Sequence, residues 1–388
     1  MNKKSFTFTG SGDEYFKIWI VNILLTIVTL GIYSAWATVR TKRYFYGNTH
    51  LDDNNFEYHA KPMQILIGRV LAIVLLIAYV FLSEVSPIIG SGFILAITLV
   101  MPWVIMRSLK FNARMSSYRN VRFSFEGLTS DAYKIFLLIP LFPAVVGALL
   151  VGLLYLILDY NDEEVRSTID SATFIIGGIA LLAIFALVPL VETFMMRYRF
   201  NNLKYGQGQF FTNVEAKPIY MIYLKLVGVV ALGYAIIAAI GAGLSQMISS
   251  GMGSGSEKLI IMLALLSIPA YLFFILFGIY TKAYIQSHKR NYLFSKTGLD
   301  KVLTLESNLK SGPLFKILAT NLLLIIISVG FAKPWTMVRL QRHIVDRTHA
   351  NIEGDLGQYV STQQEATSSF GDEMGDAFDL EGGFEVGI

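Results

Sequence analysis

Three polar side chains stand inside long apolar runs of this 388-residue chain: Asn22, Asn321 and Glu192. If these runs cross a membrane, a polar or ionisable group within them is a candidate for a substrate or ion pathway, because its burial among lipid is costly. The alternative is structural, since each asparagine can hydrogen-bond to a neighbouring helix and Glu192 can form an ion pair with Arg197. All three are therefore candidate substrate-binding residues, with these structural roles left open.

Catalytic and metal-binding patterns are absent from the sequence. It contains no cysteine, no HExxH or phosphate-binding glycine motif, and no spacing typical of Ser/His/Asp catalysis. The five histidines form no pair at i, i+4, which leaves a histidine-based metal site without support. We therefore predict that the protein is not an enzyme, that it has no catalytic residues, metal site or cofactor, and that it does not bind nucleic acid.

A second recurring pattern is a tryptophan followed four residues later by an arginine. It occurs as Trp36 with Arg40, Trp103 with Arg107, and Trp335 with Arg339. An indole ring at the level of the lipid headgroups, with a cation one helical turn further on, is typical of a membrane-interface anchor. We interpret the six residues as interface anchors, and a specific site for anionic lipid headgroups is the alternative.

The composition predicts what must position these residues. The chain is 54% hydrophobic and only 15% charged, with a mean hydropathy of +0.54, whereas a soluble domain is about 25% charged. Since a membrane-spanning helix needs about 20 apolar residues, we predict an all-α polytopic membrane protein. It would have about eight transmembrane or re-entrant helical segments, near 16–38, 64–84, 90–106, 135–158, 172–195, 219–247, 259–281 and 313–335.

The distribution of Lys and Arg predicts the orientation. These residues concentrate in four loops, whereas the intervening loops such as 82–91 and 159–170 carry almost none. Because short loops rich in Lys and Arg remain on the cytoplasmic side, we predict that four loops are cytoplasmic: 39–63, 107–134, 197–217 and 282–312.

The chain also contains internal repeats. Residues 16–50 and 315–349 are identical at 14 of 35 positions without a gap. Strand-like pieces with period-two alternation (FTFT, FEYH, FSFE, QFFT and LTLE) recur at the junctions between loops and apolar runs. These pieces either pair into a small cytoplasmic sheet below the helices or remain isolated extended linkers.

The repeated end segments leave two topologies open. Either segments 16–38 and 313–335 enter and leave on one side as re-entrant hairpins, or both cross and are antiparallel, as in inverted-repeat transporters. Neither segment has a Gly or Pro pair at its middle to make a turn, because Gly31 and Gly330 lie towards the ends. We therefore expect eight crossings, although the basic residues after segment 313–335 would then break the charge rule.

The end of the chain differs in composition. The segment 348–388 contains nine Asp or Glu residues and no Lys or Arg. Such a composition is typical of a disordered, solvated tail. We predict that residues 1–347 form the integral membrane domain and that 348–388 are an acidic, disordered tail, with a docking peptide for a protein partner as the alternative.

The repeated motif TLGIY…W..VR..RY, the strand-like FTFTG and FEYHA around it, and the acidic ending GDAFDLEGGFEVGI are similar to the YjgN family of bacterial inner-membrane proteins. The resemblance covers nearly the whole chain and implies the inner membrane of a Gram-negative-type bacterium. It supplies no site residues, because the family is described as of unknown function. One departure is Ala35 before Trp36, where Pro102 and Pro334 precede the other tryptophans.

Two functions are compatible with these patterns. The internal duplication and the matched Asn22 and Asn321 favour a transporter or channel for an unidentified solute. The Trp-Arg anchors and the single basic face favour a non-catalytic membrane scaffold or a protein that interacts with anionic lipids. In both cases the lipid bilayer is the expected partner.

Overall fold

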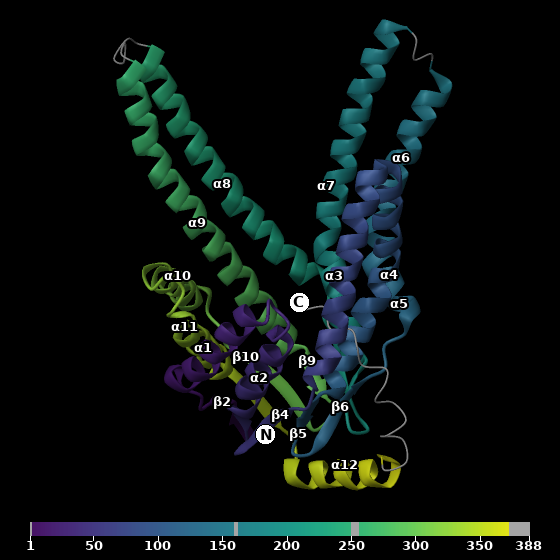
Figure 1. The fold of residues 1–388 in the computed structure, drawn as a ribbon, viewed down its shortest axis with the longest axis vertical. Helices are drawn as coiled ribbons and strands as arrows, with labels where there is room; N and C mark the ends of the chain where they lie inside the picture. Colours follow the sequence, from purple (N-terminus) through teal and green to yellow (C-terminus); the bar gives the residue numbers. More distant parts are fainter. Residues whose placement is uncertain (1, 159–161, 250–255, 372–388) are drawn as a thin grey trace.

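The computed structural model describes residues 2–158, 162–249 and 256–371. Figure 1 shows long helices that project from one end of a strand-built body, and a short helix that lies across the opposite end of that body. The long helices are therefore separated from the strands along the long axis of the molecule. Three short helices lie beside the strands instead: α1 (Gly12–Val28), α2 (Ser34–Gly47) and α11 (Lys333–Val345).

The strands form one sheet. Within the described residues they are β1 (Asn2–Ser5), β2 (Thr7–Phe8), β3 (Thr49–Leu51), β4 (Asn54–Tyr58), β5 (Ser116–Tyr118), β6 (Val121–Phe125), β7 (Leu203–Tyr205), β8 (Gly208–Thr212), β9 (Thr297–Leu299), β10 (Leu303–Ser307) and β11 (Thr348–Ile352). This 11-stranded sheet has the order β1-β11-β10-β9-β8-β7-β6-β5-β4-β3-β2, and all its pairs are antiparallel.

The two edges of the sheet belong to one N-terminal segment. Strands β1 and β2 are separated only by Phe6, yet β1 pairs with β11 and β2 pairs with β3. The amide of Phe6 donates to the carbonyl of Thr348 (3.0 Å), and that of Thr9 donates to the carbonyl of Asn48 (3.0 Å). The sheet therefore closes almost completely into a barrel, and the prediction of an all-α fold is wrong.

The strand-like pieces explain part of this barrel. FTFT, FEYH, FSFE, QFFT and LTLE contribute to β2, β4, β6, β8 and β10, so they pair into a sheet and are not isolated linkers. FEYH, FSFE, QFFT and LTLE are each joined to a preceding three-residue strand by a tight turn. Asp52 and Asp53 (φ 50° and 61°) and Arg119 and Asn120 (φ 47° and 63°) have the left-handed backbone of two-residue hairpin turns.

The helices form five hairpins, α1–α2, α3–α4, α6–α7, α8–α9 and α10–α11, each inserted between two strands. Their bounds are α1 (Gly12–Val28), α2 (Ser34–Gly47), α3 (Pro62–Val85), α4 (Pro87–Arg114), α5 (Thr129–Tyr133), the π-helix η1 (Lys134–Leu138), α6 (Ile139–Ile157), α7 (Glu163–Asn201), α8 (Ala216–Ser249), α9 (Ser256–Ser295), α10 (Ser311–Ile327), α11 (Lys333–Val345) and, beyond the hairpins, α12 (Leu356–Gly371).

Fewer helices can cross a membrane than the sequence predicts. Among the described residues, five helical stretches are long and apolar enough: Pro62–Val85, Pro87–Arg114, Thr129–Ile157, Glu163–Asn201 and Ala216–Gly233. The prediction of about eight segments is therefore wrong. The predicted segment 259–281 falls within α9, whose side chains are described from Tyr271 onwards.

The two end segments are hairpins of short helices. In the first, α1 ends at Val28 and the chain turns through Leu30 (φ 50°) and Gly31 (φ 93°), and in the second it turns through Val329 (φ 50°) and Gly330 (φ 92°). A helix of 17 residues, the length of α1, measures about 26 Å, which is less than the roughly 30 Å of a bilayer core. The expectation of eight crossings is wrong, and both segments return to the barrel as re-entrant hairpins do.

The hairpins attach to the barrel by a repeated contact. We call the strand before each hairpin incoming (β2, β4, β6, β8, β10) and the strand after it outgoing (β3, β5, β7, β9, β11). Six residues before four of the outgoing strands, a helix side chain donates to a carbonyl just beyond an adjacent incoming strand. Four such bonds are Arg43 Nη2 to Ala60 O (3.1 Å), Arg197 Nε to Val214 O (2.6 Å), Asn291 Nδ2 to Leu309 O (2.8 Å) and Arg342 Nη2 to Gly10 O (2.7 Å). The repeat unit is thus a helical hairpin with one strand on each side, present five times.

The predicted C-terminal tail is folded over its first half. Residues 348–352 form β11, and residues 356–371 form α12. Alternation in THANI and an apolar stripe on α12 explain why these residues pack against the barrel in spite of the acidic composition. The rest of the predicted tail, 372–388, including the predicted docking peptide, lies outside the described residues.

The hairpin shape of α1–α2 predicts a labelling pattern. Because the chain contains no cysteine, single cysteines can be placed at Leu30 (tip of α1–α2), Val85 (last residue of α3) and Ser361 (α12). We expect membrane-impermeant maleimide to label Val85→Cys in intact spheroplasts and Ser361→Cys only in inverted vesicles. Leu30→Cys should remain unlabelled in both, since its 94% exposed side chain would lie among acyl chains. Labelling of Leu30→Cys in spheroplasts would contradict the re-entrant hairpin.

Candidate functional site

A cavity of about 680 Å³ occupies the interior of the barrel. Its wall consists of two rings of side chains, one at the incoming strands and one at the outgoing strands. Members of the two rings stand opposite each other on neighbouring strands: Phe56 pairs with Tyr118, Phe123 with Tyr205, Phe210 with Leu299, and Leu305 with Ala350. The incoming ring is Phe6, Phe56, Phe123, Phe210 and Leu305, and the outgoing ring is Leu51, Tyr118, Tyr205, Leu299 and Ala350. Ala350 belongs to the outgoing ring by register and does not itself line the cavity.

The tyrosines of this wall serve as donors to the barrel itself. The hydroxyl of Tyr118 donates to the carbonyl of Leu51 (2.6 Å), and that of Tyr205 donates to the carbonyl of Tyr118 (2.9 Å). Burial raises the pKa of Tyr118 to about 12 and also raises the pKa of Tyr205. Both phenols therefore remain protonated at neutral pH, and the wall presents aromatic faces to the cavity.

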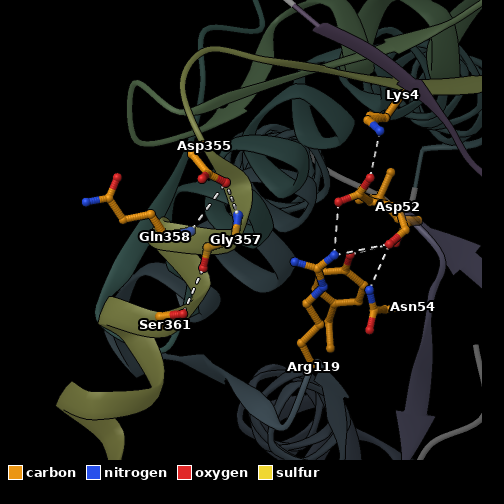
Figure 2. A network of polar contacts seen from close by, with 10 residues as sticks. Lys4, Asp52, Asn54, Arg119, Asp355, Gly357, Gln358 and Ser361 are labelled. Carbon is orange, nitrogen blue, oxygen red and sulfur yellow. Dashed lines mark hydrogen bonds and ion pairs between the residues drawn. The ribbon is translucent and has the colours of Figure 1, made fainter.

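Helix α12 closes one end of the barrel. Leu356 and Val360 are buried against the outgoing ring. Two backbone amides, of Gln207 and Gly208, donate to Oε1 of Gln363 (2.7 and 3.2 Å), and the hydroxyl of Tyr359 donates to Oδ2 of Asp300 (2.6 Å). Figure 2 shows how α12 begins: the carboxylate of Asp355 accepts from the amide of Gly357 (2.7 Å), which caps the helix.

The N-terminal strand is fastened beside this end by charged groups, which Figure 2 also shows. The carboxylate of Asp52 contacts Nζ of Lys4 (2.8 Å) and Nη2 of Arg119 (2.9 Å). The hydrogen bond from Lys4 is the main cause that lowers the pKa of Asp52. On the other side of β1, the hydrogen bond from Lys3 lowers the pKa of Glu306 to about 2. These carboxylates bind β1 and offer no group for acid–base chemistry near neutral pH.

The opposite end of the cavity is formed by helix ends and is more polar. Its lining residues there come from α2 (Phe45, Tyr46), α4 (Leu109, Asn112, Ala113), α7 (Arg199, Phe200), α9 (Arg290, Phe294) and α11 (Gln341, Val345). Two of these side chains are arginines, and no Asp or Glu is present among the described residues that line the cavity. The cavity is therefore amphipathic, with an aromatic wall and a cationic end that faces the helices.

The predicted substrate-binding asparagines lie elsewhere. Asn22 and Asn321 are buried (5% and 6% exposed) within the two short hairpins. Nδ2 of Asn321 donates to the carbonyl of Thr336 (3.1 Å), and Nδ2 of Asn22 donates to that of Ala37 (3.5 Å). Each Oδ1 accepts from the arginine of the same hairpin, Arg40 or Arg339, at 3.4 Å. The sequence assigned the asparagines to a substrate site and the arginines to interface anchors. The structure instead brings one asparagine and one arginine together in each short hairpin.

The three tryptophans also take part in packing contacts. The ring of Trp36 stacks on Tyr33, and the guanidinium of Arg107 lies 5.4 Å from the ring centre of Trp103. Trp335 stacks on Phe16, and its Nε1 donates to Asp13 (2.9 Å), which joins α11 to α1 of the next hairpin. The structure does not bring the three Trp-Arg pairs together into one site.

Glu192 forms an ion pair with a different partner from the predicted one. Its Oε1 lies 2.7 Å from Nζ of Lys289, and both side chains are about one-fifth exposed (19% and 21%). The same ammonium group lies over the ring of Tyr223, so the cluster joins α7, α8 and α9. Arg197, the expected partner, instead donates to the carbonyl of Val214.

The residues that line the cavity were not predicted as site residues from the sequence. The five alternating pieces contain all five members of the incoming ring, but four of the five members of the outgoing ring come from three-residue strands that have no pattern of their own. In the sequence, Arg290 is one of several basic residues in the predicted cytoplasmic loop 282–312. The only signal was its fixed distance of seven residues before an outgoing strand, which Lys42, Leu109, Met196 and Gln341 share. Within the described residues, no group of three or more His, Asp or Glu side chains is placed to hold a metal ion.

Comparison with known proteins gives a consistent picture. A family model with the description "Bacterial protein of unknown function (DUF898)" matches residues 3–377. The chain is 26% identical over 370 residues to "Inner membrane protein YjgN" of Salmonella typhimurium, which covers 92% of this chain and 90% of that protein. Proteins of the same name from Escherichia coli O157:H7 and K12 are 27% identical over 235 residues, or 59% of this chain and 56% of each relative.

No solved structure matches the chain. The relatives and the long apolar helices show an inner-membrane protein in a lipid bilayer, and the resemblance stated from the sequence is confirmed. The chain belongs to the DUF898 family, which includes the YjgN inner-membrane proteins.

Proposed function

We propose that this protein binds an amphipathic molecule in the barrel cavity and does so without catalysis. The cavity carries the proposal: about 680 Å³ of space within a nearly closed barrel has the size of a ligand site, for which about 300–1,000 Å³ is typical. On the roughly 30 Å³ that a water molecule occupies in the liquid, it has room for about 20 waters. An aromatic wall is a poor surface for so many waters and a good one for an apolar chain.

The position of the cavity supports a ligand that comes from the membrane side. Its polar end lies where the helices enter the barrel, and α12 covers the other end. The four basic loops that the positive-inside rule assigns to the cytoplasm contain eight of the eleven described strands, β3 to β10. The barrel is therefore proposed to stand in the cytoplasm directly below the inner leaflet, within reach of amphipathic molecules.

A cavity-filling substitution tests this function. Ala113, Val345, Phe200, Phe294 and Tyr46 hold the same position, three residues before an outgoing strand, and all line the cavity. Because three of the five are aromatic, Ala113→Phe copies a side chain that the fold already accepts at this level. We expect Ala113→Phe to lower the amount of copurified amphipathic ligand, measured by mass spectrometry of organic extracts, by tenfold or more.

Two further variants control this experiment. Val345→Phe fills the same level from a different helix and should give the same loss. Leu128→Phe places the same ring at a 64% exposed position outside the cavity and should leave the ligand unchanged. Equal amounts of ligand in all three variants and in the unmodified protein would refute binding in the cavity.

Transport is the second candidate function, and the cluster of Glu192, Lys289 and Tyr223 favours it. A charged pair between three long helices, next to the barrel, is typical of a site that changes its partners during transport. The two end segments no longer support an inverted repeat, because both are hairpins on the same barrel. Liposomes that contain the protein should move a fluorescent anionic amphiphile between leaflets, and no acceleration over empty liposomes would reject transport.

A further inference from the structure

We propose that the ligand of the barrel cavity is an anionic amphiphile whose headgroup binds the guanidinium of Arg290. This inference rests on the proposed function and specifies its ligand class. The apolar chain of the ligand would lie against the aromatic rings of the wall, and the anion would lie at the helix end of the cavity.

The first support is the way in which Arg290 is held. Its Nη2 donates to Oγ1 of Thr348 (2.9 Å), and the hydroxyl of Thr348 in turn donates to the carbonyl of Ile344 (2.9 Å). The guanidinium lies over the ring of Phe294, 4.1 Å from its centre. Two elements therefore fix the guanidinium, α9 through the ring and β11 through the hydroxyl, so it is oriented before any ligand arrives.

The second support is that the charge of Arg290 has no counter-ion in the described part of the chain. No carboxylate there lies within ion-pair distance of it, and its Nε is buried without a hydrogen-bond partner. An unpaired buried donor on a charged group costs more than a neutral one. An anion bound in the cavity beside the guanidinium would neutralise this charge.

The third support is the contrast with the equivalent residue of the first repeat. Lys42 also stands seven residues before an outgoing strand, but its Nζ donates to the hydroxyl of Tyr58 (3.3 Å) and to Oδ1 of Asn112 (3.0 Å). The ammonium group of Lys42 therefore already has hydrogen-bond acceptors among the neighbouring side chains. Arg290 keeps hydrogen-bonding capacity for a ligand, and Arg199 adds a second positive charge to the same lining.

The charge state of Arg290 is compatible with this role. Burial lowers the pKa of Arg290 to about 10, so the guanidinium remains protonated near neutral pH. Arg290 also lies beyond the apolar run that ends at 281, at the barrel end of α9. A fork of N–H groups at this place suits a carboxylate or a phosphate monoester, both of which accept two hydrogen bonds.

The test compares a charged probe with its neutral counterpart. The full chain, held in amphipol and freed of detergent, is titrated with cis-parinaric acid and with its methyl ester, whose fluorescence rises in an apolar cavity. In the unmodified protein we expect the acid to bind about 10- to 100-fold more tightly than the ester, the range of a charge-assisted hydrogen bond. In Arg290→Gln the acid should weaken to the affinity of the ester, while the ester is unchanged.

The controls separate this inference from the proposed function. Arg339→Gln removes an exposed arginine of a short hairpin and should leave the preference for the acid intact. Ala113→Phe should weaken acid and ester alike. If the unmodified protein binds both probes equally well, the ligand class is wrong while cavity binding stands. If it binds neither probe, the proposed function fails.

Two refinements make the result decisive. Unchanged ester binding in Arg290→Gln reports a folded cavity; if that variant does not fold, the acid-to-ester ratio of the unmodified protein alone decides. Displacement of parinarate by palmitate or by lysophosphatidic acid distinguishes a free fatty acid from a phospholipid-derived source. Displacement by neither would overturn the inference.

Discussion

Replacing Leu356 and Val360 by aspartate is expected to release helix α12 and to open the barrel end to water. Both side chains are buried against the outgoing ring, and Val360 is only 3% exposed. Each substitution removes about 1.5–3 kcal/mol of apolar burial and places a carboxylate among apolar side chains, which costs several kcal/mol more. Few hydrogen bonds, chiefly those of Tyr359 and Gln363, remain to hold the helix.

A buried cysteine reports the release. Ala350→Cys places a thiol in the outgoing ring, at a position with no exposed surface, in a chain that has no other cysteine. We expect the double aspartate variant to raise its maleimide labelling rate by at least a hundredfold. Ser361→Asp, on the exposed face of the same helix, should leave the rate unchanged. A slow, unaltered rate in the double variant would show that α12 is not what closes this end.

Deletion of residues 2–9 is expected to abolish the barrel. This segment supplies all of β1 and β2, so its loss leaves β11 and β3 with unpaired edges. It also removes Phe6, which stacks on Phe56, and Phe8, which stacks on Phe45. Burial of the two rings contributes about 3–6 kcal/mol in total, and each lost backbone bond about 0.5–1.5 kcal/mol. The sum is comparable to the whole stability of a domain, about 5–15 kcal/mol.

Limited proteolysis measures the outcome. The truncated protein should be cut within the strands at a protease concentration that leaves the full chain intact. A synthetic peptide of residues 1–11 should restore protection by strand addition, whereas the same peptide with Phe6 and Phe8 changed to Ser should not. Lys3→Ala removes only the exposed pair with Glu306 and is expected to cost less than about 1 kcal/mol. Protection of the truncated protein without peptide would show that the barrel does not depend on this closure.

The sequence predicted the parts of the fold that have a strong local signal. Long apolar runs, basic loops and the alternation in FTFT or FSFE are local patterns, and they correctly indicated a membrane protein with strand-forming junctions. The strands THL, SSY, LKY and TGL contain three residues each, too few for a period of two to appear. Their pairing depends on register with distant partners, so the barrel, and with it the cavity, could not be predicted from local patterns.

The turns of the short hairpins were missed for a different reason. A search for a Gly or Pro pair overlooks Leu30 and Val329, which adopt the left-handed backbone without being glycine. The adjacent Gly31 and Gly330 are the only conventional signal, and they lie near the end of each apolar run because the run includes part of the returning helix. The partner of Glu192 shows the same limit, since Lys289 is 97 residues away.

The closure of the sheet by one segment also constrains the order of folding during synthesis. The two halves of residues 2–8 have partners at opposite ends of the chain, since Thr7 pairs with His50 and Ser5 with His349. At about 5–20 residues per second, the ribosome needs roughly 15–60 s after β4 to produce β11. Through this interval the nascent chain carries an open strand edge beside the membrane, and only the last repeat can cover it. Barrel closure is therefore the final step of assembly, and truncated nascent chains would carry a persistent site for aggregation or chaperone capture.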